Sequence, residues 1–324
     1  MSEIYLVFVV FLFVLAVFDL MVGVSNDAVN FLNSAIGAKV AKFRTIIIVA
    51  AVGVFMGATM SNGMMEVARN GVFHPAMFSL KELMFIFLAV MISDVILLDI
   101  FNNLGLPTST TVSLVFELLG GTTAFVLLKL ANDTTGLTVG DLMNTEKALG
   151  MIMAIFVSVA IAFFFGIVLQ YISRLVFTFT YKKNLKWKIG IFGGVATTAI
   201  FYFMLFKGIK SMSFVTPEIY EYIQNHTLTI LGICFLASTA IMQFLYFLKV
   251  NVFKILVLMG TFALAMAFAG NDLVNFIGVP LAGYSAYTDF AASGASDPST
   301  FMMSSLEGPA KSPMIFLVAA GAVM

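Results

Sequence analysis

The hexapeptide Asn26-Asp27-Ala28-Val29-Asn30-Phe31 recurs as Asn271-Asp272-Leu273-Val274-Asn275-Phe276, with five of the six positions identical. Each copy lies near the end of a long apolar run. If the apolar runs cross a membrane alternately, the chain enters the two copies from opposite sides, so the copies form an inverted repeat. Inverted repeats in transporters place the binding site at the repeat interface, near the middle of the membrane. The sequence therefore predicts that the two copies meet and form one site.

The composition is that of a membrane protein. Of the 324 residues, 61% are hydrophobic and 10% are charged, whereas about 25% of the residues of an ordinary soluble domain are charged. A membrane helix needs about 20 apolar residues. Eight runs reach or approach this length: 4–25, 45–64, 83–105, 112–128, 148–173, 189–206, 227–248 and 255–271. We expect an all-α polytopic membrane protein with about eight transmembrane helices, with broken helices or a re-entrant hairpin, and a truncated ninth helix in Pro313–Met324.

The connecting segments predict an orientation. Alternate connections carry ten basic residues and no acidic residue: Lys39, Lys42, Arg44, Arg174, Lys182, Lys183, Lys186, Lys188, Lys249 and Lys254. Basic residues next to membrane helices mark the cytoplasmic side. This predicts a multi-pass protein with its N-terminus outside the cell. The short loops and the missing targeting segment favour a bacterial inner membrane.

Six acidic residues lie within or beside the apolar runs: Asp19, Asp27, Asp94, Asp99, Glu117 and Asp272. No Lys or Arg lies among them, so metal cations or protons are the expected counter-charges. For Asp19, Asp94 and Asp99, a protonated carboxyl or a hydrogen bond within helix packing explains the sequence equally well. The formal net charge of zero argues against nucleic acid as a partner.

The first apolar region is too long for one straight span, which predicts an interruption near Gly23–Asp27. Asn26 and Asn30 are four residues apart, and Asp27 and Asn30 are three apart, so each pair shares a helix face. Oxygen-rich ligands of this kind suit a hard cation such as Na⁺. The second copy offers the same groups in Asn271, Asp272 and Asn275.

A second motif, Leu104-Gly105-Leu106-Pro107-Thr108-Ser109-Thr110-Thr111, interrupts the hydrophobic region between Asp99 and Glu117. Glycine and proline break a helix here, and four hydroxyl residues follow. Proline followed by Ser or Thr is also an ordinary helix start. In this context the hydroxyl groups and the backbone N–H groups could hold a tetrahedral oxyanion, with a cation bound beside it.

Together the two motifs resemble the inorganic phosphate transporter (PiT) family, which carries a Gly-Ala-Asn-Asp signature and a Pro-x-Ser-Thr-Thr hairpin in each of two inverted halves. The resemblance implies that phosphate is contacted by Ser109, Thr110, Thr111, Asn26 and Asn271. It implies that the coupling cations are held by Asn26, Asp27, Asn271 and Asp272, to which the shared helix faces add Asn30 and Asn275. The coupling ion is Na⁺ in some members and H⁺ in others, and no other cofactor is expected.

The sequence departs from the family pattern in three places. Ser25 replaces the usual alanine, Val112 stands where the family often has histidine, and no second Pro-x-Ser-Thr-Thr occurs before Met324. The second half is therefore expected to be incomplete. We expect a first repeat in residues 1–173, a connecting region in 174–250 and the start of the second repeat in 251–324.

The predicted function is secondary active transport of inorganic phosphate by a protein that is not an enzyme and that lies in membrane lipid. Asp99 and Glu117 are candidates for a proton-accepting or supporting carboxylate. Transport of another tetrahedral oxyanion such as sulfate, and a passive anion channel, remain alternatives at this point. The oligomeric state is open, with a homodimer as one alternative.

Overall fold

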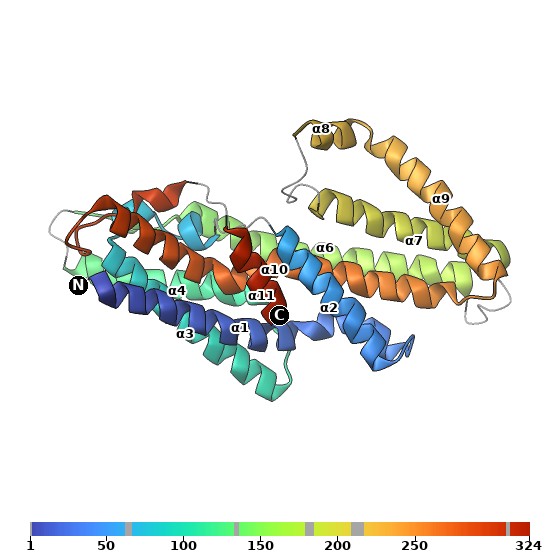
Figure 1. The fold of residues 1–324 in the computed structure, drawn as a ribbon, viewed down its shortest axis with the longest axis horizontal. Coiled ribbons are helices and arrows are strands. Elements are labelled where there is room, and N and C mark those ends of the chain that lie inside the picture. The colour runs from blue at the N-terminus through green and yellow to red at the C-terminus, as the bar shows by residue number, and fades with distance from the viewer. Residues whose placement is uncertain (1, 62–66, 133–135, 179–184, 209–216, 309–311) are drawn as a thin grey trace. The chain divides into compact units, whose positions relative to one another are not determined.

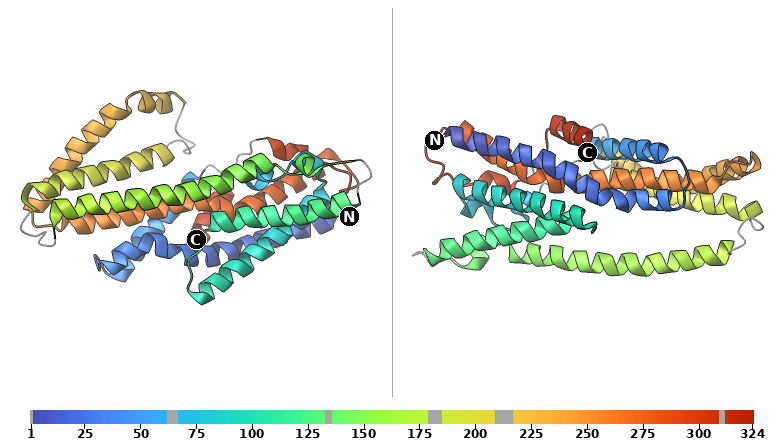
Figure 2. Two further views of the ribbon diagram at one scale, coloured as in Figure 1. Left: turned by 180° about the vertical axis from the view of Figure 1, so that it is seen from behind. Right: turned by 90° about the horizontal axis from the view of Figure 1, so that it is seen from below.

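A computed structural model describes residues 2–61, 67–132, 136–178, 185–208, 217–308 and 312–324. Every named element in these ranges is helical (Figures 1 and 2). The α-helices are α1 (Ser2–Gly37), α2 (Phe43–Met60), α3 (Leu80–Leu104), α4 (Thr110–Ala131), α5 (Val139–Leu142), α6 (Thr145–Phe177), α7 (Leu185–Gly208), α8 (Pro217–Asn225), α9 (Thr227–Phe247), α10 (Val252–Ser293) and α11 (Met314–Val323). Short helices lie at η1 (Val67–Gly71), η2 (Pro75–Met77) and η5 (Ser304–Glu307). Eight of the described helices are long and apolar enough to cross a membrane, which confirms the predicted number.

Helix α1 is continuous, so the predicted interruption near Gly23–Asp27 is wrong. An unbroken helix satisfies its interior backbone groups internally, and nothing in this stretch removes an N–H group as proline would. Helix α10 is also continuous, although Pro280 lies inside it. It reaches Ser293, so the irregular segment expected from Gly283 begins only at Gly294, whose φ of +69° ends the helix.

The chain does break between α3 and α4, where the second motif predicted an interruption. Gly105 has a φ of +67°, a conformation that glycine adopts without a steric penalty. The Gly105 N–H donates to Asn102 O at 3.0 Å, and the Leu106 N–H donates to Phe101 O at 2.9 Å. These bonds close the end of α3. The chain then turns back through Ser109, the N-cap of α4, and the two helices pack side by side (Figure 2).

The described residues form two compact units. The first contains Met1–Val29, Asn62–Ile155 and Gly270–Met324. Its fully buried side chains include Phe73, Phe78, Phe87, Leu12 and Met84. The predicted division into residues 1–173, 174–250 and 251–324 stays a prediction.

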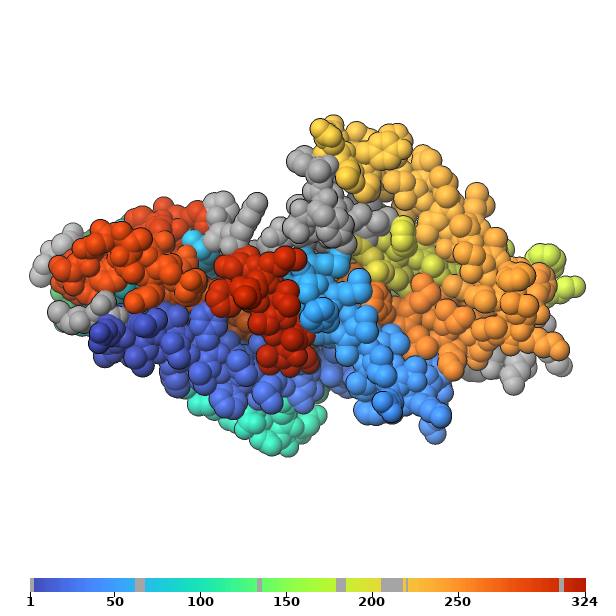
Figure 3. Space-filling view, in the orientation of Figure 1, coloured from blue at the N-terminus to red at the C-terminus, as the bar shows by residue number. Residues whose placement is uncertain are grey.

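A buried arginine fastens the segment that follows α10. The guanidinium of Arg69, in η1, donates to Ser305 O at 2.9 Å and to Leu306 O at 3.4 Å, both in η5. It also donates to Ser285 Oγ at 3.4 Å. Arg69 is only 4% exposed, and burial lowers its pKa from the ordinary value. In the same unit, Phe13, Tyr284 and Phe316 bring α11 against α1 and α10 (Figure 3).

The second unit contains Asn30–Ser61 and Phe156–Ala269. Gly53 and Gly57 of α2 lie against the backbone of α10, at Phe262 O and Met266 O respectively. Small residues four apart allow two membrane helices to approach this closely. Helices α7 and α9 also pack against each other, where Gly193 and Gly194 of α7 lie against Met242 and Thr239 of α9.

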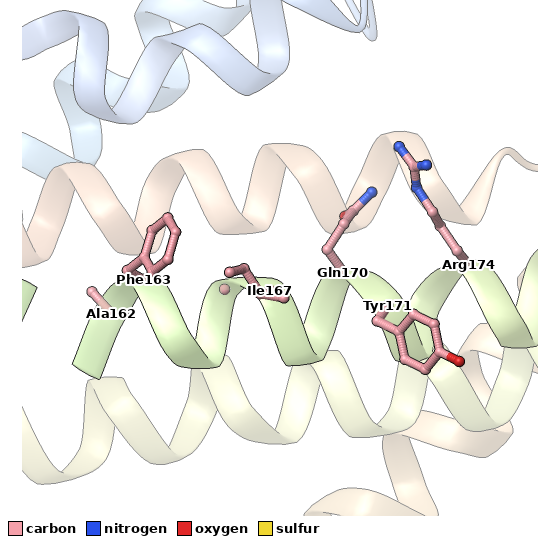
Figure 4. Close-up of a pocket in the computed structure, with 7 residues that line it drawn as sticks. Ala162, Phe163, Ile167, Gln170, Tyr171 and Arg174 are labelled. Atoms are coloured by element: carbon pink, nitrogen blue, oxygen red, sulfur yellow. The ribbon is translucent and has the colours of Figure 1, made fainter. Parts of the chain in front are cut away.

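Helix α6 presents an apolar surface. A shallow hollow lies along one side of it, lined by Ala162, Phe163, Gly166, Ile167, Gln170, Tyr171 and Arg174 (Figure 4). All of these residues belong to α6, so the hollow is an open surface groove and not an enclosed pocket. No residue of the most apolar window of α6 is buried, and lipid hydrocarbon suits such a surface.

Candidate anion and cation site

Asn26 attaches α1 to the turn between α3 and α4. Its Nδ2 donates to Asn102 Oδ1 at 3.1 Å and to Leu106 O at 3.0 Å. Its Oδ1 accepts the Thr108 N–H at 2.8 Å. Asn102 returns a bond, because its Nδ2 donates to Val22 O at 2.8 Å. The first Asn-Asp copy therefore fixes the incoming side of the hairpin tip, the segment 102–111.

The second copy binds the outgoing side of the same hairpin tip. Asn275 Nδ2 donates to Thr111 Oγ1 at 2.9 Å and to Thr110 Oγ1 at 3.3 Å. The Thr111 hydroxyl in turn donates to Asp272 Oδ1 at 3.2 Å. Asp272 Oδ1 also accepts from Asn275 Nδ2 at 3.0 Å and from Asn271 Nδ2 at 3.3 Å. Three donors thus hold this carboxylate in one orientation.

The two copies also approach each other directly. Gly23 lies three residues before Asn26, and Phe276 ends the second copy. A Cβ placed on Gly23 would overlap the ring of Phe276, which is fully buried. Glycine is needed here so that α1 and α10 can come this close. The structure therefore brings the two Asn-Asp copies and the hairpin tip together, as the inverted repeat predicted.

The two copies use different asparagines. In the first copy the first asparagine, Asn26, binds the hairpin, whereas in the second copy the last asparagine, Asn275, does so. Asn271 is exposed and interacts with its neighbour Asp272. Asn30 is exposed and belongs to the second compact unit. The two copies of the repeated sequence therefore make different contacts with the same hairpin.

The other predicted site residues occupy contrasting environments. Asp27 is buried, with 4% of its surface exposed. Ser109 is exposed and accepts the Val112 N–H at 3.4 Å as the N-cap of α4. Asp99 lies on the exposed side of α3 and accepts from Asn103 at 3.1 Å. Both carboxyl oxygens of Glu117 are buried in α4.

The sequence reasoning did not assign Asn102 to the site, nor the backbone groups of Leu106 and Thr108. Asn102 is half-buried and links Asn26 to the backbone of α1. An asparagine at the end of an apolar run, directly before Gly-Leu-Pro, was the available signal. The backbone contacts depend on the turn geometry and leave no mark in the sequence.

The donors around the hairpin tip are neutral. They are the hydroxyls of Thr110 and Thr111, the amides of Asn26 and Asn275, and the N–H groups at the first turn of α4. The N-terminus of a helix attracts an anion through its free N–H groups and its dipole. Two basic groups of this unit are engaged elsewhere: half-buried Lys129 pairs with Glu82 at 3.0 Å, and buried Arg69 holds η5. An anion bound here would need a cation beside the carboxylates of Asp27 and Asp272.

Comparisons with known proteins show the family and the fold of this chain. The sequence model described as "Phosphate transporter family" matches residues 23–324. A solved structure titled "The sodium-dependent phosphate transporter" superposes with a TM-score of 0.69 at 20% sequence identity, and the match covers 98% of this chain and 74% of that chain. At this identity the similarity shows the fold. No match is found among the curated proteins.

The family match covers most of the chain. It confirms the predicted resemblance, the polytopic helical fold and membrane location, and the prediction that the protein is a transporter and not an enzyme. The chain belongs to the phosphate transporter family.

Proposed function

We propose that this protein carries inorganic phosphate across the membrane together with Na⁺, by alternating access, and that phosphate binds at the hairpin tip. The observation that carries the proposal is that both Asn-Asp copies hydrogen-bond to this one hairpin: Asn26 on the incoming side and Asn275 on the outgoing side. A movement of either copy therefore changes the position of the hydroxyl groups that would hold the anion.

Phosphate would accept hydrogen bonds from the hydroxyls of Ser109, Thr110 and Thr111 and from the N–H groups that begin α4. Thr111 now donates to Asp272, so an arriving anion would compete for that proton. The amides of Asn26 and Asn271 would complete the contacts, Asn26 chiefly by positioning the turn. The described part of the chain places no arginine or lysine at this site, so hydrogen bonding would have to distinguish phosphate from other anions. Sulfate is the competing anion to test.

Na⁺ would bind beside phosphate, between oxygen atoms of Asp27 and Asp272 and of Asn26, Asn271 and Asn275, which all belong to the first compact unit. Hard monovalent cations prefer carboxylate and amide oxygens. The solved structure similar in fold carries "sodium-dependent" in its title, which favours Na⁺. Val112, which occupies the place where the family often has histidine, also favours Na⁺ over H⁺. A cation in this position would offset the charge of the anion, so that the two ions would bind together.

We place the N-terminus outside the cell, because the connections with ten basic and no acidic residues then face the cytoplasm. The bacterial inner membrane is the proposed location. With this orientation α3 runs from the outside to the cytoplasm and α4 runs back. The hairpin tip that joins them then lies toward the cytoplasmic side.

The experiment is uptake of radiolabelled phosphate into proteoliposomes that contain the full-length protein. An inward Na⁺ gradient should drive uptake, and a proton gradient of equal size should not. Asp27→Asn and Asp272→Asn should each abolish the Na⁺-driven component, whereas Asp99→Asn, on the exposed side of α3, should leave it unchanged. Uptake that depends on neither gradient would indicate a channel. If an equal concentration of sulfate displaced the radiolabelled phosphate, the substrate assignment would be wrong.

A further inference from the structure

Three acidic side chains that the proposed phosphate site does not use lie buried in the first compact unit. Asp19 of α1 and Asp94 of α3 are both 0% exposed. The third is Glu117 of α4, whose carboxyl oxygens are also buried. Among the residues that the structure describes, none of the six carboxyl oxygens has a hydrogen-bond partner. Buried polar atoms without partners are rare and require an explanation.

The three carboxyl groups lie close enough to interact. Asp19 interacts electrostatically with both Asp94 and Glu117, and Glu117 interacts with Asp94. The carboxyl groups of Asp19 and Asp94 are within hydrogen-bond reach of each other, and such a bond requires a proton on one of them. Ser113 lies within hydrogen-bond reach of Asp94, and its hydroxyl also donates to Thr110 O at 3.1 Å. One hydroxyl proton that is shared with the backbone could serve at most one of the six carboxyl oxygens.

Three other charged groups on the surrounding helices have other partners or face outward. Lys129, on the same helix as Glu117, pairs with Glu82 near the start of α3. Asp99 lies on the exposed side of α3, and Asp272 of α10 is bound to the hairpin tip. The electrostatic partners that the structure gives for the triad of Asp19, Asp94 and Glu117 are thus its own members and Ser113.

The triad stands in register with the phosphate site. Asp19 lies seven residues before Asn26 on α1, and Glu117 lies seven residues after Thr110 on α4, so each pair shares a helix face. Asp94 lies eight residues before Asn102 on α3. Seven or eight residues correspond to two helical turns, or about 11 Å along the axis. The triad therefore forms a separate layer about two turns from the hairpin tip.

Three ionised carboxylates in this layer would repel one another in a medium that screens charge poorly, and the part of the chain that the structure describes gives them no cationic partner. A proton removes one negative charge. It also supplies an O–H donor that can bridge two carboxyl oxygens, which satisfies atoms that otherwise have no partner. A proton is thus the smallest ligand that meets both requirements of the layer.

We propose that Asp19, Asp94 and Glu117 form a proton-binding site, distinct from the phosphate and Na⁺ site, in which the three carboxyl groups share at least one proton at neutral pH. The site joins α1, α3 and α4, the helices that hold the first Asn-Asp copy and the hairpin tip. If the proposed function is correct, gain or loss of this proton changes how those helices pack around the bound anion.

Infrared spectroscopy tests the proposal directly, because a protonated carboxyl has a carbonyl-stretch band that amides and ionised carboxylates lack. The full-length protein would be purified in a maltoside detergent, which has no ester carbonyl. The difference spectrum of wild type minus Asp19→Asn/Asp94→Asn/Glu117→Gln at pH 7 should show such a band, shifted by exchange into D₂O. Wild type minus Asp99→Asn should show none.

The proposal is overturned if the wild-type protein has no protonated-carboxyl band at pH 7, or if the triple variant keeps the whole of it. If the triple variant does not assemble, the single variants Asp19→Asn and Glu117→Gln replace it. Each should shift or weaken the band, and an unchanged band in both would equally overturn the proposal. The measurement uses neither phosphate nor Na⁺, so its failure would not affect the proposed transport function.

Discussion

The attachment of the hairpin tip by Asn26 leads to a quantitative prediction. Asn26→Ala removes three hydrogen bonds: those to Asn102 Oδ1 and Leu106 O, and the one accepted from the Thr108 N–H. Each is worth about 1 kcal/mol net. The variant should therefore lower the free energy of local opening of the hairpin tip by about 3 kcal/mol, which raises the equilibrium constant for opening about 100-fold.

The assay is hydrogen–deuterium exchange of peptides that cover residues 104–112, with the full-length protein in lipid nanodiscs. The Thr108 amide should exchange about 100-fold faster in Asn26→Ala. The matched control is Asn103→Ala, because Asn103 is exposed and bonds only one turn back along α3 to Asp99. Phosphate affinity should fall with the fraction of molecules that keep the tip in place. Unchanged exchange at Thr108 would refute the idea that Asn26 positions the hairpin.

Three further predictions concern other contacts of the two units. Thr111→Val removes the hydroxyl that donates to the aspartate of the second copy and should weaken phosphate binding about 10-fold by isothermal titration. The control Thr123→Val loses a bond to Leu119 O in its own helix and a weak bond to Met143 Sδ, both away from the hairpin tip, and should leave phosphate binding unchanged. Gly57→Leu places a side chain against the backbone of α10 and should destabilise the protein by about 1–3 kcal/mol in thermal unfolding; Gly166→Leu, which points into open space, should not, and equal melting temperatures would count against this packing. Arg69→Gln breaks buried hydrogen bonds that are worth about 1.5–3 kcal/mol each. Limited proteolysis within residues 294–308 should therefore be faster in this variant. An unchanged cleavage rate would mean that Arg69 does not hold this segment in place.

Much of the fold could be predicted because membrane helices must be long and apolar. The eight runs, the break after Leu104 and the resemblance to the family follow from composition, from glycine and proline, and from two short motifs. The repeat of Asn26–Phe31 in Asn271–Phe276 also predicted that the copies meet. In each case a local rule and the long-range contact agree.

The predicted interruption of α1 fails for a physical reason. A region too long for one straight span can break, tilt or bend, and only the first requires a break in the helix. Length alone could not decide between these outcomes. The close approach of Gly23 to Phe276 accounts for this glycine without any break in the helix.

The sequence also could not predict which asparagine of each copy binds the hairpin. Asn26 and Asn275 hold the hairpin, but they occupy different places in the repeated hexapeptide. Which asparagine faces the hairpin depends on how each helix is rotated about its axis, and the repeat leaves that rotation open. In the same way, the sequence identified Asp19 and Asp94 as intramembrane acids without showing that they converge.

The most direct test of the central claim is an electron cryo-microscopy map of the full-length protein in lipid with phosphate and Na⁺. The account predicts density for the anion at the first turn of α4, within hydrogen-bond distance of the hydroxyls of Thr110 and Thr111, with cation density beside Asp27 or Asp272. Anion density away from the hairpin tip, or Asp27 and Asp272 on different sides of the molecule with the tip in contact with neither copy, would contradict it.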